Sequence, residues 1–314
     1  MLTRRHIRVK VLQSIYAYNH RAHPDIDVQE KFLNYSIAQM LDLYLLMLKL
    51  LTSLPDQAEE YLERSQQKFL ATELEKNPSR NFVDNKLLKL IGSTPAFTDA
   101  IEKKKLDYWK LDTEYLSIIL KELREKNWYV DYLTLKNPSF KEDQKFVIRM
   151  YKEIVAPNDK LYEYLEDKRL TWMDDFPIVN TAIVKMLGKL TEENASKHLV
   201  PELFKNDEDQ EYAVQLFRKV ILNEEKLNEE IKGKTPNWDQ DRIADIDLII
   251  LKMGIAEFLY FPSIPVRATI NEYLEVSKEY STPKSSIFVN GILDKIVKEF
   301  EENGKLNKIG RGLQ

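Results

Sequence analysis

The chain contains no cysteine, which excludes disulfides, thiolate metal sites and cysteine nucleophiles. It also lacks a glycine-rich phosphate loop, a GxSxG nucleophile elbow and an HExxH zinc helix. Of its four histidines, His6, His20 and His23 lie close in sequence, but their spacing does not match a zinc site. We therefore expect a binding protein rather than an enzyme, with no catalytic residue, metal or cofactor.

Turn-forming residues are also scarce, with only 8 glycines and 12 prolines in 314 residues. Leucine, lysine, glutamate and isoleucine dominate instead, and no alternating apolar run typical of a strand is present, so the composition predicts an all-α fold. The most apolar stretch, Ile37 to Leu51, contains Asp42 and Lys49 and is too short to cross a bilayer. We interpret it as a buried helix. Because the first residues lack the apolar core of a signal peptide, we expect a cytoplasmic protein without a membrane partner.

Charge is distributed unevenly, although the formal net charge is only -4. Basic residues precede the first acid, Asp25, and a smaller basic cluster follows the last acid, Glu302. These residues are Arg4, Arg5, Arg8, Lys10 and Arg21 at the start, and Lys305, Lys308 and Arg311 at the end. Phosphate binding depends on such local positive potential rather than on the total charge.

The first predicted helix carries this basic cluster ahead of an apolar stripe formed by Ile7, Val11, Ile15 and Tyr18. Arg4 and Arg8 are four residues apart on one face, and the neighbouring basic candidates are Arg5, His6 and Lys10. Cations in the first turns oppose the helix dipole, and a bound phosphate would relieve that cost. The alternative is a solvated helix start without a ligand.

Further helices are expected at intervals along the chain. Breaks are predicted at residues 23–25, at Pro55 and at Pro138. The predicted helices are residues 28–51, a third helix to about residue 75, shorter helices at 84–91 and 99–126, and later helices at 267–279 and up to about 302.

Two segments resemble each other at a spacing of 66 residues, which predicts a duplicated helix pair. The matches are Glu142-Asp143-Gln144 with Glu208-Asp209-Gln210, Phe146 with Tyr212, Leu161 with Leu227, Trp172 with Trp238, Asp175 with Asp241 and, after one inserted residue, Ile183–Met186 with Ile250–Met253. Chance similarity between two amphipathic helix pairs is the alternative.

Gly291 lies inside an otherwise strong helical segment, where glycine is less favourable than alanine by about 0.8–1 kcal/mol. This predicts that a neighbouring helix packs closely on Gly291. Phe288, three residues earlier, is a core residue by its spacing, or alternatively offers a stacking face to an unpaired base.

The later motifs resemble the NusB family of transcription antitermination factors. Ile270-Asn271-Glu272 followed by Phe288-Val289-Asn290-Gly291-Ile292-Leu293-Asp294-Lys295 is similar to the INE…FVNGxLDK pattern of that family. Asp245 to Leu251 with Glu257 to Tyr260, and the turn at Ile264-Pro265, resemble its preceding elements. The opening residues 4–8 and Leu12-Gln13-Ser14-Ile15-Tyr16 resemble its arginine-rich first helix, although His6 stands where the family often has arginine.

The resemblance implies an all-helical adapter that pairs with NusE, a small-subunit ribosomal protein. Such a pair binds boxA-type RNA and helps RNA polymerase read through terminators in ribosomal RNA operons. By this resemblance Arg4, Arg5 and Arg8 hold RNA phosphates, with His6 and Lys10 extending the same surface. Phe288 and Asn290 border the RNA path, and Tyr16 and Glu257 face the protein partner.

The domain organisation expected is a NusB-like helical bundle with an inserted helical lobe. Its parts are a first helix (residues 1–21), an inserted helical region (22–140), a first copy of the duplicated pair (141–205), a NusB-like core (206–302) and a basic tail (303–314). An adapter that binds only proteins is the alternative function. An RNA cytosine methyltransferase carrying a NusB-like domain is disfavoured, because such an enzyme needs cysteines and a glycine-rich cofactor loop.

Overall fold

The structure, a computed structural model, describes residues 1–69, 72, 76–234 and 244–313. These residues form helices joined by turns and short loops, with no strand among them, so the predicted all-α class is confirmed. The chain divides into two compact units. The first unit contains residues 1–37 and 203–314, and the second contains residues 38–202. The sequence predicts the corresponding boundaries at 21/22 and 205/206.

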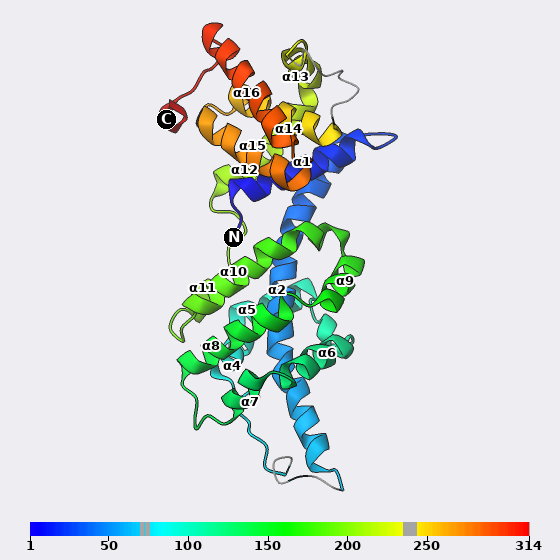
Figure 1. Ribbon diagram of the computed structural model, residues 1–314, viewed down its shortest axis with the longest axis vertical. Helices are drawn as coiled ribbons and strands as arrows, with labels where there is room; N and C mark the ends of the chain where they lie inside the picture. The colour runs from blue at the N-terminus through cyan, green and yellow to red at the C-terminus, as the bar shows by residue number, and fades with distance from the viewer. Residues whose placement is uncertain (70–71, 73–75, 235–243, 314) are drawn as a thin grey trace. The chain divides into compact units, whose positions relative to one another are not determined.

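The first unit is built around α14 (Asp245–Tyr260), whose central residues from Ile249 to Phe258 are all buried. Figure 1 shows α14 among the other helices of this unit. It contacts α1 (Arg4–Asn19), α12 (Asp207–Leu222), α13 (Glu224–Ile231), α15 (Val266–Tyr280) and α16 (Ser285–Glu302). The unit also contains the 3-10 helix η5 (Gly310–Leu313). A helix with apolar residues on every side requires such cover, and the two charged residues in this stretch, Lys252 and Glu257, are buried with them.

The second unit contains most of α2 (Ile26–Gln66), the helix whose N-terminal residues belong to the first unit. The other elements of the second unit are α4 (Lys86–Ser93), α5 (Pro95–Lys104), η1 (Tyr108–Lys110), α6 (Thr113–Arg124), α7 (Asn127–Leu133), α8 (Phe140–Met150), the π-helical turn η2 (Tyr151–Val155), α9 (Asp159–Lys168), η3 (Leu170–Asp175), α10 (Phe176–Lys189) and α11 (Ala195–His198). Local sequence sets several of these boundaries. Ser139 starts α8 with a capping box, in which its N–H and hydroxyl donate to Glu142 Oε2, each at 2.7 Å.

Residues 37–51 of α2 are mostly buried, as predicted for a core helix. By length and composition, α2 is the one helix in the described ranges that is apolar enough to cross a membrane, but 72% of its most apolar window is buried inside the protein. The predicted break at Pro55 is wrong, because α2 continues through it to Gln66. Proline removes one backbone hydrogen bond. Buried Leu54 and Ala58 on either side of Pro55 keep the helix anchored.

Two other expectations about helices differ from the structure. The single helix predicted at 99–126 is divided into α5, η1 and α6, because Lys105 adopts the left-handed conformation at φ 55° and ends α5. The third helix predicted to residue 75 merges with α2 up to Gln66, and residues 73–75 lie outside the described residues.

The two similar segments fall on equivalent elements where both are described. The first copy covers α8, α9, η3 and α10. The described part of the second copy covers α12, α13 and the first part of α14. Trp172 of the first copy is buried, and its indole Nε1 donates to the Gln39 carbonyl oxygen at 2.8 Å. Trp238 and Asp241 lie outside the described residues, so the duplication stays a prediction.

Close helix packing occurs at Gly254 rather than at Gly291, where it was predicted. A Cβ on Gly291 would meet nothing within 4 Å, and Gly291 is exposed on α16. A Cβ on Gly254 would lie 3.0 Å from Cδ2 of Leu293 on α16. The glycine that lets α14 and α16 approach is therefore on α14.

Candidate nucleic-acid interface

The predicted basic cluster lies at the N-terminus of α1, where His6 helps to start the helix. The Thr3 N–H donates to His6 Nδ1 at 3.2 Å. Burial lowers the pKa of His6, and the positive charge of Arg5 lowers it further. The lowered pKa favours the neutral form of His6 at pH 7.

Below the surface, Arg8 and Glu257 form a buried ion pair that joins α1 to α14. The Arg8 Nε and Nη2 atoms donate to the two carboxylate oxygens at 2.7 and 2.9 Å. The same carboxylate accepts hydrogen bonds from the hydroxyls of Tyr212 at 2.5 Å, Tyr273 at 2.7 Å and Thr269 at 2.9 Å. These contacts connect α1, α12, α14 and α15 through one carboxylate.

Glu257 is ionised in this environment. Burial by itself raises the pKa of a carboxyl group, but the charge of Arg8 and the hydrogen bonds from Arg8, Tyr212 and Tyr273 outweigh it and lower the pKa of Glu257. The pKa values of both tyrosines are raised, by burial and then by the Glu257 charge, so the two hydroxyls remain protonated donors. The Arg8 guanidinium lies 5.5 Å from the centroid of each tyrosine ring.

This arrangement corrects two expected roles. Arg8 was expected to contact RNA and Glu257 to face a protein partner, but they are only 3% and 0% exposed and bind each other. A buried charge is retained when an opposite charge and further hydrogen bonds replace its water. Both residues therefore hold α1 in place and do not present a binding surface.

Arg4 and Arg5 lie closer to the solvent than Arg8, with side chains 26% and 42% exposed. Arg4 Nε donates to Asp209 Oδ1 and its Nη2 donates to Glu208 Oε1, both at 2.7 Å. Arg5 binds both carboxylate oxygens of Glu272, at 2.9 and 3.0 Å. Arg4 and Arg5, the exposed arginines that were predicted to contact phosphates, are therefore both paired with carboxylates.

These arginines line a groove of about 640 Å³ in the first unit. It is bordered by the start of α1, by the turn and first residues of α15, and by the C-terminal segment. The lining residues are Thr3, Arg4, Arg5, His6, Arg8, Ser263, Ile264, Pro265, Ala268, Glu272 and Arg311. A polyanion entering this groove meets guanidinium groups from both ends of the chain.

The remaining predicted site residues lie elsewhere. Lys10 is only 3% exposed. Phe288 and Asn290 are half-buried on α16 and do not line the groove, and Asn290 Nδ2 donates to Asp294 at 3.0 Å. Tyr16 is 41% exposed and stacks on His20 with ring centroids 4.1 Å apart. The structure therefore gathers Arg4, Arg5, His6 and Arg8 but not the residues on α16.

Sequence reasoning did not identify the acids that pair with the arginines, and it placed Arg311 in the C-terminal basic cluster without assigning it to this site. Glu208 and Asp209 appeared only as markers of the repeat, and Glu272 only as part of a motif. Glu272 lies in a motif that carries the family likeness, whereas Glu208 and Asp209 lie outside those motifs. Which arginine each one meets depends on tertiary contacts across more than 200 residues.

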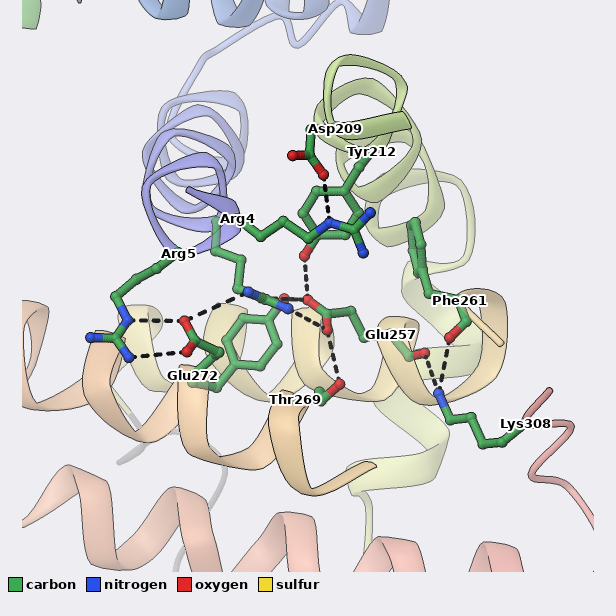
Figure 2. Close-up of polar contacts among 11 residues, drawn as sticks. Arg4, Arg5, Asp209, Tyr212, Glu257, Phe261, Thr269, Glu272 and Lys308 are labelled. Carbon is green, nitrogen blue, oxygen red and sulfur yellow. Dashed lines mark hydrogen bonds and ion pairs between the residues drawn. The ribbon is translucent and has the colours of Figure 1, made fainter. Parts of the chain in front are cut away.

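The C-terminal segment docks on the end of α14 through Lys308. Its Nζ donates to the carbonyl oxygens of Glu257 at 3.1 Å and Phe261 at 3.0 Å (Figure 2). Burial lowers the pKa of Lys308 to about 8, although Glu257 acts in the opposite direction. The Ile309 N–H donates to the Pro262 carbonyl oxygen at 3.1 Å. These contacts bring Arg311 to the groove.

Among the residues that the structure describes, no three His, Asp or Glu side chains are grouped closely enough to hold a metal ion. The polar groups of this site suit ion pairing with an anion rather than metal binding.

Comparison with known proteins identifies the family. The model of the NusB family matches residues 178–298, a region that excludes α1. Three relatives are each named transcription antitermination protein NusB. The protein from Salinibacter ruber is 41% identical over 110 residues, which are 34% of this chain and 69% of the relative. The proteins from Chloroherpeton thalassium and Methylacidiphilum infernorum are 38% and 40% identical, over 38% and 30% of this chain and 58% and 66% of their own lengths.

No solved structure matches the chain. The family match confirms the resemblance recognised from the motifs, and it confirms the expectation of a protein that is not an enzyme. The chain belongs to the NusB family of transcription antitermination factors.

Proposed function

We propose that this protein binds boxA-type single-stranded RNA together with NusE and supports antitermination by RNA polymerase in ribosomal RNA operons. It acts in the cytoplasm. Its family supports the general role in antitermination. The observation that carries RNA binding is the groove at the start of α1, where Arg4 and Arg5 are both partly exposed.

RNA phosphates compete for these arginines with the carboxylates that hold them. The pairs with Glu208 and Glu272 are partly exposed, and exposed ion pairs are worth about 0–1 kcal/mol, so exchanging either carboxylate for a phosphate has a small cost. A phosphate offers a full negative charge and two free oxygens that match the guanidinium fork. Affinity for RNA should therefore come from several such exchanges and should fall with salt.

The buried pair of Arg8 and Glu257 supports this function indirectly. It fixes α1 against α14, so the side chains of Arg4 and Arg5 leave the helix from a defined position. Rigid placement reduces the conformational entropy that is lost when RNA binds. Phe288 and Asn290 remain predicted contacts for an unpaired base on the α16 face, and Tyr16 remains a predicted contact for NusE.

The test is binding of a boxA-containing RNA, compared with a scrambled RNA, at several salt concentrations with and without NusE. The native chain is compared with Arg4→Ala/Arg5→Ala, which leaves the buried Arg8 intact. Arg218→Ala is a matched control, because Arg218 is another partly exposed arginine of the first unit that pairs with two carboxylates, Asp27 and Glu30. We expect specific binding that strengthens with NusE and is lost in the double variant but not in the control.

An adapter that binds only proteins is the second candidate, and the carboxylate pairing of Arg4 and Arg5 favours it. In that case these arginines only stabilise the fold. Binding of NusE without any preference for boxA RNA, unchanged in the double variant, would make this the correct function.

A further inference from the structure

Glu208 lies between two arginines that come from opposite ends of the chain. Its Oε1 accepts a hydrogen bond from Arg4 Nη2 at 2.7 Å, and its Oε2 is 3.7 Å from Arg311 Nη2. The side chain of Glu208 is 50% exposed and that of Arg311 is 74% exposed. One solvated carboxylate therefore occupies the space that an anion bound by both guanidinium groups would use.

Arg4 stays in place without Glu208, because a second carboxylate holds it. Asp209, with a side chain only 9% exposed, accepts from Arg4 Nε at 2.7 Å. The Arg4 guanidinium also lies 5.2 Å from the centroid of the Tyr212 ring. The buried acid thus orients the guanidinium, while the exposed acid only covers its outer edge.

Arg5 is less available than Arg4. Both oxygens of Glu272 bind its guanidinium, and Arg8 Nη1 lies 3.7 Å from the same carboxylate. Displacing Glu272 would also remove a neighbour of the buried Arg8. Arg4 and Arg311 therefore form the cationic pair that an incoming anion can reach with the smallest rearrangement.

The C-terminal segment fixes Arg311 at the groove. Lys308 and Ile309 bind carbonyl oxygens at the end of α14 and in the turn that follows it. Gly312 packs so tightly that a Cβ there would lie 1.9 Å from the Pro262 carbonyl oxygen. Arg311 lies between these contacts and lines the groove with Arg4.

We propose that Arg4 and Arg311 form a binding site for an RNA phosphodiester, and that Glu208 occupies this site as an internal substitute until RNA displaces it. The inference rests on the proposed function and adds Arg311 to its binding residues. Removing the Glu208 charge should strengthen RNA binding, whereas removing the Arg311 charge should weaken it. If the ion pair between Arg4 and Glu208 only stabilised the fold, removing the Glu208 charge would disturb the site and weaken RNA binding.

The experiment measures the affinity of the full chain for the boxA-containing RNA, with NusE present, as a function of salt. We expect Glu208→Gln to bind roughly 3- to 10-fold more tightly, since a competing charge at the rim is removed. The matched control is Glu211→Gln, the same change at an exposed position of the same helix, because it is Glu208 and not Glu211 that pairs with Arg4 and Arg311. It should leave the affinity unchanged.

Arg311→Ala should weaken binding roughly 3- to 10-fold and reduce the slope of log affinity against log salt by about 0.7, the value for one phosphate contact on single-stranded nucleic acid. Arg311→Lys should keep the slope, because the charge remains. Gly312→Ala should reproduce the loss by displacing the segment, and combining it with Arg311→Ala should add little. Unchanged circular dichroism spectra would show that each variant is folded.

Two results overturn the inference and leave the proposed function standing. The first is weaker or unchanged RNA binding by Glu208→Gln. The second is an unchanged salt slope for Arg311→Ala. Both apply where the Arg4→Ala/Arg5→Ala variant has lost RNA binding. Absence of RNA binding by the native chain in the presence of NusE overturns both.

Discussion

Replacing Arg8 by methionine tests the role assigned to the buried ion pair. Methionine fills a similar volume but leaves the Glu257 carboxylate without its opposite charge. Breaking one partner of a buried pair costs about 3–5 kcal/mol. The hydroxyls of Tyr212, Tyr273 and Thr269 still donate to Glu257, so we expect the lower end of that range, about 3 kcal/mol.

Hydrogen exchange followed by mass spectrometry measures the loss of stability within one unit. A measurement within one unit is needed because the chain has two units and its global unfolding need not be two-state. A loss of about 3 kcal/mol corresponds to exchange of the α14 amides that is faster by a factor of more than about 100. Peptides from α10 in the other unit serve as the internal reference. Acceleration below about 10-fold in α14 at pH 7 would refute the argument that this pair holds α1 on α14.

The pH dependence gives the same reasoning a second test. In the native protein the pKa of Glu257 is lowered, so its contribution to stability is present above the unfolded pKa and is lost as pH falls through the folded pKa. In Arg8→Met burial raises that pKa, and protonation relieves the penalty as pH falls. The difference between the variant and the native protein should shrink from pH 7 to pH 5, and Arg8→Met/Glu257→Leu should recover most of the stability. A difference that grows toward pH 5 would contradict this.

Further predictions concern three glycines and a lysine. Gly312→Ala should displace the C-terminal segment, because its Cβ would overlap the Pro262 carbonyl oxygen, and limited proteolysis should then cut there faster without a lower melting temperature. Gly291→Ala meets nothing within 4 Å and should stabilise α16 by roughly 0.5–1 kcal/mol, measured by hydrogen exchange of the α16 amides. Gly254→Ala should destabilise by about 1 kcal/mol in the same measurement, since a buried leucine on α16 must move. The ammonium group of Lys308 should titrate near 8 by NMR, and a titration midpoint near 10 would refute its burial. Because the pKa of Lys308 is lower in the folded than in the unfolded protein, its contribution to stability should increase as pH rises from 8 toward the unfolded pKa.

The helical class and the apolar stripe of α1 were predictable because they depend on local composition and periodicity. Ile7, Val11 and Ile15 are all buried, as their spacing predicts. The continuation of α2 through Pro55 was not predictable in the same way. The packing of residues on either side outweighs the missing hydrogen bond, and that packing is a tertiary effect.

The candidate site was predictable in its residues but not in its pairing. The basic cluster at Arg4, Arg5 and Arg8 is visible in the sequence, yet nothing local distinguishes the buried Arg8 from its exposed neighbours. The difference depends on Glu257, which lies 249 residues away. Likewise, the glycine in the FVNG motif drew attention to α16, whereas the close approach of two helices required Gly254 on α14.

The long separation between Arg8 and Glu257 also sets an order of events during synthesis. At about 5–20 residues per second, a ribosome needs roughly 12–50 s to make the 249 residues from Val9 to Glu257. During that time α1 has emerged without the carboxylate that later neutralises Arg8, whereas all of residues 38–202 have already been made. The second unit can therefore fold before the buried ion pair that holds α1 on α14 is able to form.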